Sequence, residues 1–356
     1  MSDQVDAAML RDSLAPELEY PSDKAPADVT GYGENEGFWV WDDDRKTGMH
    51  LWLGTWADYS LRMGRVTIWL PDGRILTRIQ EGPGTRQGVA SNGVLSAAPV
   101  VPYESWQWNL FGSVQPTTAQ ELRQGPLGDG PRVLVKVSAE ARMISSPWVN
   151  GGFQSADAFE ASDLSKLSGG FRLEQFLHAE GTIEIAGENP IVFSGVGNRT
   201  HRKGARAVGG GGLPGHFWTA AIFPSGRSFY IQWFGEGVGK MTLSECWVRE
   251  GDIFHKAEVI DPCLFDPVLN GERFTIQLRS ALGFTTIEAE RVAQSFQTLL
   301  VTTSPSGETW GIDYDRDPYN LAMDQGFMRY EWNGEVACNF IERSRQARFV
   351  STEFQK

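Results

Sequence analysis

The sequence has few of the residues that build metal centres and disulfide frameworks. Three cysteines occur in 356 residues, Cys246, Cys263 and Cys338, an odd number without paired spacing. Neither a disulfide framework nor a zinc motif is therefore predicted. The five histidines show no His-x-His or His-x-x-x-His spacing. A metal site would need ligands from distant segments, and we predict none.

Motifs of nucleotide-dependent and nucleophilic enzymes are also missing. The chain has no Walker A sequence and no Gly-x-Ser-x-Gly motif of the α/β-hydrolases. The glycine-rich segment 235–240 lies between strand patterns and opens no helix, which favours a hairpin turn over a phosphate-binding loop. We therefore expect no bound cofactor.

Long hydrophobic runs and an excess of positive charge are absent as well. No run approaches the roughly 18 apolar residues of a membrane-spanning helix, and the first residues show no apolar signal segment. We expect a cytoplasmic protein without integral membrane association. The formal net charge of −13 argues against nucleic acid or an anionic membrane surface as a partner.

Aromatic residues and short alternating patterns are abundant. The 13 Trp and 20 Phe suit the faces of β-sheets and apolar ligand cavities. Apolar and polar residues alternate over 133–141 and 274–278, and turn sequences such as Pro71–Arg74 separate the strand patterns. Only 118–123 and 156–167 resemble helices. These features predict a mostly β protein of antiparallel barrels or sandwiches with few short helices.

A repeated turn suggests two similar halves. The Pro-x-Gly-Arg sequence of Pro71–Arg74 recurs at Pro224–Arg227, and the glycine run 209–212 is the best linker candidate. We predict a flexible N-terminal arm and two domains, with bounds at 1–30, 31–207 and 208–356. A single long β-meander with one flexible loop is the alternative.

Basic and titratable side chains gather where the two halves are expected to meet. The strand pattern of 191–193 breaks at the glycines of 195–197, and residues 198–206 then contain His201 and four cationic residues. Loops at such junctions often carry chemistry because a rigid scaffold positions them. A solvated basic turn is the alternative that composition alone leaves open.

Several short motifs follow one another in a fixed order between residues 32 and 346. They are Asn35–Trp39, Leu70–Arg74, Pro102–Trp108, Ser146–Trp148, Arg172–Gln175, Gly197–Arg206 and Ile341–Arg345. In this order they resemble the bacterial lipocalin-like two-domain family related to carotenoid 1,2-hydratase (hydroxyneurosporene synthase) and AttH. The resemblance is closest to the large uncharacterised bacterial branch of that family.

The resemblance implies two lipocalin-like β-barrels packed together around an apolar cavity. It also implies a cofactor-independent hydratase, dehydratase, isomerase or cyclase acting on an isoprenoid- or polyketide-like molecule, as a monomer or homodimer. Aromatic walls can stabilise a developing cation, and a buried acid with a raised pKa can supply or remove a proton. The alternative is a non-catalytic carrier of a lipid or terpenoid, which needs only the cavity.

The same resemblance indicates candidate site residues. The Asp of the family's junction motif is Thr200 here, which cannot donate a proton as a carboxylic acid does, whereas the motif's histidine is kept as His201. We predict that His201 is the general acid or base in a cavity between the halves, with Glu36 or Glu174 as its carboxylate partner. A purely structural His201 is the alternative. The predicted substrate-binding residues are Arg199, Arg206, Trp39, Trp41, Trp218, Trp233 and Tyr330.

Overall fold

The alternating segment that begins at Val133 forms strand β9 (Val133–Met143) in the computed structural model, with its valines turned inward. The structure describes residues 3–22, 32–55, 61–84, 88–168, 170–205, 215–235, 243–260, 272–299, 309–314, 321–347 and 350. Strands account for 67% of the structure and helices for 9%, which confirms the predicted mostly β class. No described helix has the length and apolar character needed to cross a bilayer.

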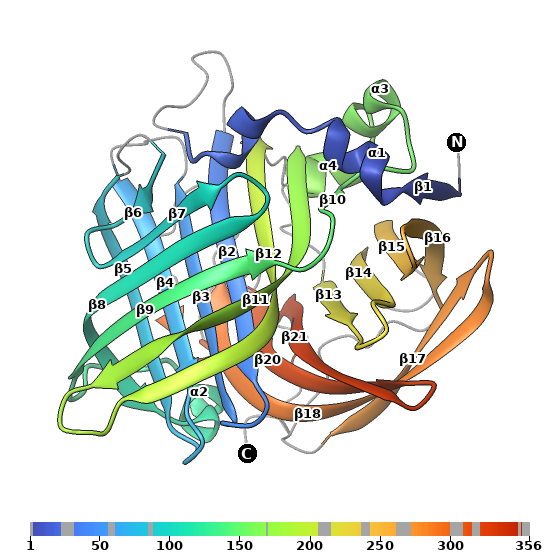
Figure 1. Cartoon of the computed structure of the whole chain (residues 1–356). Helices are drawn as coiled ribbons and strands as arrows, with labels where there is room; N and C mark the ends of the chain where they lie inside the picture. The colour runs from blue at the N-terminus through green and yellow to red at the C-terminus, as the bar shows by residue number, and fades with distance from the viewer. Residues whose placement is uncertain are drawn as a thin grey trace.

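Eight strands close the first barrel in chain order (Figure 1). They are β2 (Tyr32–Asp42), β3 (Thr47–Thr55), β4 (Leu61–Trp69), β5 (Ile75–Pro83), β8 (Ser105–Thr117), β9, β11 (Phe171–Ile185) and β12 (Ile191–Ala205). Each is antiparallel to the next, and β12 pairs with β2 to close the circle. The short strands β6 (Ala90–Ser91), β7 (Leu95–Val101) and β10 (Trp148–Val149) extend this sheet.

The second sheet repeats this circular order. Its strands are β13 (Gly215–Ile222), β14 (Ser228–Gly235), β15 (Leu243–Glu250), β16 (Ile253–Val259), β17 (Arg273–Ser280), β18 (Gly283–Leu299), β20 (Leu321–Trp332) and β21 (Glu335–Gln346), with β19 (Thr309–Trp310) beside β18. Pairing of β16 with β17 and of β21 with β13 completes the circle. Both halves are thus antiparallel meanders whose last strand returns to the first.

The few helices are short, as expected. They are α1 (Ala7–Asp12), a 3-10 turn over Pro16–Glu19, α2 (Ala119–Gln124), α3 (Ala156–Glu160) and α4 (Asp163–Ser168). The N-terminal arm, expected to be flexible, is packed over its described part. Strand β1 (Gln4–Asp6) pairs with β16, and the buried Glu19 forms an ion pair with Arg199 at 2.7 Å. Strand pairing and a buried charge pair hold this arm.

The segment predicted as a junction loop is mostly a strand. β12 runs from Ile191 to Ala205 without a break and pairs with β11 on one side and β2 on the other. Its glycines serve close backbone approach, because a Cβ atom on Gly197 would lie 1.7 Å from the carbonyl oxygen of Trp39. The predicted domain boundary at 207/208, Arg206 and the glycine run 209–212 lie outside the described residues.

Strand alternation separates three apolar cores. Along β2, Phe38 points into the first barrel, and its neighbour Trp39 points toward the second. The core between the barrels includes Trp41, Trp218 and Phe327, and the rings of Trp41 and Phe327 lie 5.1 Å apart between centroids. A third core fills the second barrel. The contact between the two barrels is therefore largely aromatic, and we call it the seam.

Candidate active site

A solvent-open crevice with about 650 Å³ of space leads toward the seam. Ser145, Ser146, Gln175 and Arg249 line both this crevice and a smaller inner pocket. The inner pocket offers about 10 Å³, which is close to the space that one water molecule requires. The two barrels both contribute to its walls, with Glu174, Asn198, Phe176 and Trp148 from the first and Tyr230, Trp247 and Phe254 from the second.

Glu174 is the carboxylate that lines the inner pocket. Along β11, Phe176 packs in the seam and Leu177 in the first barrel, so strand alternation places Glu174 on the seam side with Phe176. Arg172 Nε donates to Glu174 Oε1 at 2.6 Å, and Asn198 Nδ2 donates to Glu174 Oε2 at 2.8 Å. Burial raises the pKa of Glu174, although the charge and the hydrogen bond of Arg172 oppose the rise. Glu174 is thus a buried carboxyl group suited to proton exchange.

A hydroxyl donor lies beside this carboxyl group. Tyr230 is fully buried on β14, and its hydroxyl donates to Glu174 Oε1 over 3.5 Å. Burial raises the pKa of Tyr230 well above its ordinary value, and the nearby Glu174 charge adds to this rise. The phenol therefore stays protonated and can hold a substrate oxygen or water beside Glu174.

A second carboxyl group, Glu245, lies on β15 behind the pocket wall. Its neighbour Cys246 packs in the second barrel, so Glu245 faces the seam as Trp247 does. The Gly151 backbone N–H donates to Glu245 Oε1 at 2.5 Å. Burial raises the pKa of Glu245 to about 8 against the opposing effects of Gly151 and Trp148. Glu245 therefore carries a proton at neutral pH.

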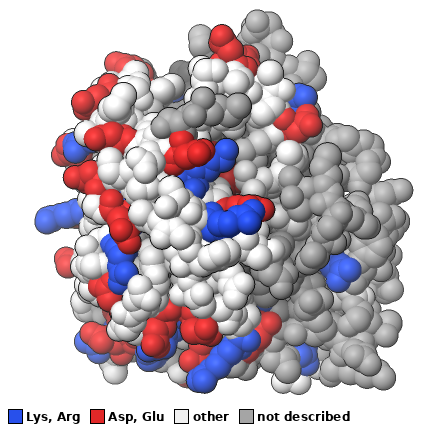
Figure 2. Space-filling view, turned by 90° about the vertical axis from the view of Figure 1, so that its right-hand side faces the viewer, with Lys and Arg blue, Asp and Glu red and all other residues white. Residues whose placement is uncertain are grey.

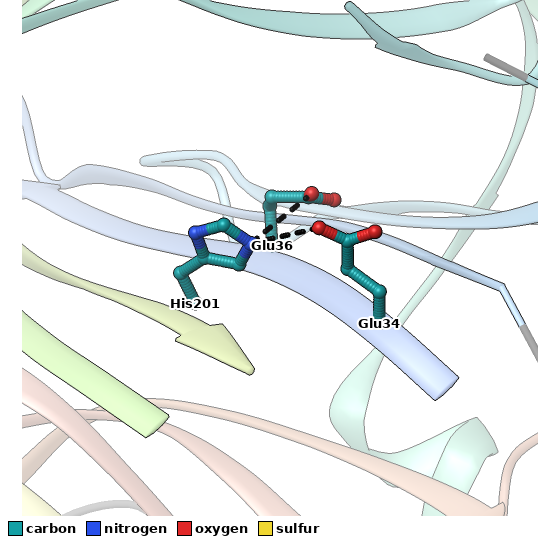
Figure 3. Close-up of side chains that lie close together, drawn as sticks. All are labelled: Glu34, Glu36 and His201. Atoms are coloured by element: carbon teal, nitrogen blue, oxygen red, sulfur yellow. Dashed lines mark hydrogen bonds and ion pairs between the residues drawn. The ribbon is translucent and has the colours of Figure 1, made fainter. Parts of the chain in front are cut away.

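His201 lies in a different buried cluster, inside the first barrel (Figure 3). His201 Nε2 is 3.1 Å from Glu34 Oε1 and 3.7 Å from Glu36 Oε1. Arg62 Nη1 donates to Glu36 Oε2 at 2.7 Å, and Lys203 Nζ is 3.1 Å from Glu34 Oε1. We call these five residues the barrel cluster. Two cationic side chains in it balance two carboxylates.

The two carboxyl groups of the barrel cluster differ in their proton affinity. Burial raises the pKa of Glu36, and the charge of Arg62 offsets only part of this rise. Burial also acts to raise the pKa of Glu34, but the hydrogen bond and charge of His201, together with Lys203, outweigh it and lower this pKa to about 2. Glu34 is therefore ionised at neutral pH and anchors the cluster.

The barrel cluster has the donor atoms of a metal site but already contains its counterions. One ligand atom each from Glu34, Glu36 and His201 lies within 4.8 Å of the others. A divalent cation would have to compete with Lys203 and Arg62 for both carboxylates. Beside Glu36, apolar side chains leave no space for a water-sized molecule. We therefore assign neither a metal nor a substrate to this cluster.

The predicted site residues fall into three separate places. His201 and Glu36 lie 3.7 Å apart in the first barrel and not at the seam between the halves. Glu174 points to the seam and is not the partner of His201. Arg199, predicted to bind substrate, pairs with Glu19 and donates to Gln175 inside the protein. Trp39, Trp41 and Trp218 lie in the seam, whereas Trp233 and Tyr330 belong to the core of the second barrel.

Sequence reasoning missed Glu34, Arg62, Tyr230 and Glu245. Glu34 precedes Glu36 by two residues, so strand alternation places both carboxylates on one face and was a usable signal. Glu245 likewise alternates with core residues on β15, but no motif marks it. Tyr230 and Arg62 meet their partners only through strand pairing across the fold.

Fold and pocket together describe a two-barrel protein with buried carboxyl groups at an aromatic seam. Solved structures are similar to this protein in fold. No family model and no curated protein matches the sequence. An AttH-like protein from Nitrosomonas europaea is 10% identical over 91% of this chain and 95% of that chain, with a TM-score of 0.56. CghA is 10% identical over 89% of this chain and 88% of that chain, with a TM-score of 0.50. The TM-score is 0.51 for the structure of CghA with Sch210972.

Kievitone hydratase from Nectria haematococca matches less well, at 8% identity over 93% of this chain and 99% of that chain, with a TM-score of 0.48. At 10% identity the AttH-like protein and CghA show a likeness of fold alone. The expected likeness to AttH is confirmed at the level of fold, and no match supports the carotenoid hydratase branch.

Proposed function

We propose that this protein is a hydratase- or cyclase-type enzyme that needs no cofactor and works at the inner pocket of the seam. The observation that carries the proposal is Glu174, a buried carboxyl group of raised pKa at the inner end of an open crevice. The structure of the similar CghA with Sch210972 supports the proposal, since a small molecule accompanies the same fold there.

The proposed reaction is a proton transfer to an unsaturated, mostly apolar substrate of isoprenoid or polyketide type. Glu174 in its acid form donates its proton to a substrate double bond, which leaves a carbocation and the Glu174 carboxylate. Ring faces in the pocket wall stabilise the cation. Water then adds to the cation and returns a proton to Glu174, which gives hydration. The reverse sequence dehydrates, and capture by a second double bond followed by proton loss gives a ring.

Neighbouring groups support this chemistry without reacting. Tyr230 orients the water or a substrate oxygen through its hydroxyl. Arg172 holds the carboxyl group of Glu174 in place, and Glu245 keeps its own proton so that no second negative charge forms nearby. His201 as the acid or base is the competing assignment, but the barrel cluster lies on the other face of the strands, and the space beside Glu36 is too small for a water molecule.

The proposal is tested by conversion of natural compounds. The protein is incubated with an apolar extract of its native host in water labelled with heavy oxygen, and the mixture is analysed by liquid chromatography and mass spectrometry. We expect a labelled hydrate, or an isomer with a shifted retention time. Glu174→Gln should slow its formation by roughly 10²–10⁴-fold. Enrichment of a compound without any conversion would instead identify a carrier, and unchanged conversion by Glu174→Gln would reassign the acid, with His201→Gln tested next.

A further inference from the structure

The crevice that leads to the inner pocket is positively charged in a strongly negative protein. Arg11, Arg142 and Arg249 line it, whereas Glu104 is the one carboxylate among its described lining residues. The chain as a whole carries a formal charge of −13. On the described part of the face in Figure 2, by contrast, Lys and Arg lie among Asp and Glu. The lining of the crevice therefore differs from the mixed charges on that face.

Arg142 differs from the other two arginines of the crevice, because no counterion pairs with it among the described residues. It is exposed on β9, and it has no hydrogen bond or ion pair within the described parts of the chain. Arg11 is different, because its Nη2 is 3.0 Å from Glu104 Oε1 and the two charges offset each other. Unpaired guanidinium groups at the mouth of a crevice attract anions and can bind a carboxylate through two parallel hydrogen bonds.

Arg249 lies where the crevice meets the inner pocket, since it lines both. It is 9% exposed, and Nε donates to the carbonyl of Gly251 at 2.9 Å. Nη2 also donates to Asp252 at 3.2 Å, but that carboxylate is 82% exposed and weakly held. Arg249 thus places a positive charge close to Glu174, on the side from which a substrate would enter.

Apolar side chains complete the crevice. Met143, Ile144 and Pro147 follow Arg142 along its wall, and Ile144 is 44% exposed. Such a combination fits a molecule with an apolar body and one charged group.

We infer that the ligand of this crevice is an amphipathic anion, which rests on the proposed function. Arg142 and Arg249 hold its anionic group, and its apolar body lies along Met143 and Ile144 and reaches toward Glu174. The charged group stays at the arginines because their guanidinium groups donate hydrogen bonds to it. The substrate class is thereby narrowed from any apolar molecule to an unsaturated organic acid or a comparable anion.

Binding of a matched pair of probes tests this inference by isothermal titration calorimetry at pH 7.5. Decanoate and decan-1-ol share the same chain length and differ in the anionic group. Decan-1-ol is the more apolar probe, so binding by apolar contact alone favours it. We expect the wild type to bind decanoate about tenfold more tightly, the range of one hydrogen-bonded charge pair. High salt should reduce this preference.

Two arginine variants locate the effect. Arg142→Gln should abolish most of the preference for decanoate. Arg132→Gln makes the same charge change at an exposed arginine whose only described ion pair is a 3.9 Å contact with Asp129, and it should keep the preference. The inference would be overturned if the wild type bound both probes equally or did not bind decanoate. It would also be overturned if the two variants lost the preference for decanoate to the same extent.

Glu174→Gln separates this inference from the proposed function. The variant should keep its preference for decanoate, because the arginines are unchanged. Loss of turnover in Glu174→Gln without any decanoate preference in the wild type would refute the anionic ligand alone. A preference for decanoate with unchanged turnover in Glu174→Gln would refute the proposed role of Glu174 alone.

Discussion

Glu174 and His201 lie on opposite faces of one pair of antiparallel strands. The register of β11 and β12 pairs Leu173 with His201 and Glu174 with Thr200. Because side chains alternate between the faces of a sheet, a shift of one residue sends His201 into the first barrel and Glu174 to the seam. Two titratable groups on neighbouring strands therefore belong to separate sites, and of the two it is Glu174 that lines the inner pocket.

The aromatic seam predicts a large stability effect at Phe327. Its ring lies 5.1 Å from that of Trp41 and 5.2 Å from that of Trp69. Phe327→Ala should lower the free energy of unfolding by about 3–5 kcal/mol, because it leaves a cavity among rigid rings. Phe284→Ala is the matched control, since Phe284 is 76% exposed on a neighbouring strand. Urea unfolding measures the free energy of unfolding of both variants. Similar losses in the two would show that the seam contributes little to stability.

Glu34→Gln tests whether the barrel cluster is structural. The change removes the carboxylate that pairs with Lys203 and the nearer of the two carboxyl groups beside His201, and removal of one partner from a buried pair costs about 3–5 kcal/mol. The folded-state pKa of Glu34, about 2, lies below its ordinary 4.5. Its stabilisation is thus complete above pH 4.5 and is lost as the pH falls toward 2. Urea unfolding measures the free energy of unfolding of wild type and variant, and the difference between the two should shrink from pH 7 to pH 3.

An exposed glutamate provides the control for that experiment. Glu184 pairs with Lys136 at 2.8 Å, but both side chains are about half exposed. Glu184→Gln should therefore change the stability by less than about 1 kcal/mol. Equal effects of the two substitutions, or a Glu34→Gln protein as stable as the wild type, would contradict a structural role for the cluster.

Local patterns in the sequence predicted the fold class, and contacts between distant segments decided the site. The helix after Thr118 could be predicted because its capping residues are neighbours in the chain. His201 and Glu34 are 167 residues apart, so no local pattern announces their contact. The repeated turns indicated two halves, yet Pro71–Arg74 joins the third and fourth strands of its barrel and Pro224–Arg227 the first and second. Strand closure, not the turn, is what the halves share.

The basic segment 198–206 was misread for a related reason. Glycines and charged residues are typical of loops when considered alone. In the fold, the buried Arg199 and the half-buried Lys203 pair with Glu19 and Glu34, which come from the N-terminal part of the chain. A strand that buries charge is recognisable only after those partners are placed.

Gly197→Ala should disrupt the pairing of β12 with β2. The new Cβ atom would lie 1.7 Å from the Trp39 carbonyl oxygen, and a backbone atom held in a sheet cannot move aside. We expect a loss of more than about 4 kcal/mol, or an insoluble protein. Gly128→Ala is the control, because a Cβ atom there meets open space and the stability should change by less than about 1 kcal/mol. Thermal unfolding followed by circular dichroism compares them, and equal melting temperatures would contradict the close approach.

Glu245→Gln tests whether the carboxyl group of Glu245 at the seam is protonated at neutral pH. The amide keeps an acceptor for the Gly151 N–H but cannot ionise. The pKa of Glu245 in the folded protein, about 8, lies above its ordinary 4.5, so the folded state binds this proton more tightly than the unfolded state. The resulting stabilisation is complete below pH 4.5 and is lost as the pH rises through 8. The variant should therefore gain stability relative to the wild type across this window.

Urea unfolding of both proteins between pH 5 and pH 9 measures this gain. The contributions of the other titrating groups, which both proteins share, cancel in the difference between their free energies of unfolding. One pKa unit corresponds to about 1.4 kcal/mol, so the gain reaches at most about 5 kcal/mol. A difference that stays flat with pH would mean that Glu245 is ionised at neutral pH. In that case the seam would hold a fixed negative charge beside Glu174, and that charge would favour protonation of Glu174 while weakening the binding of an anion at Arg249.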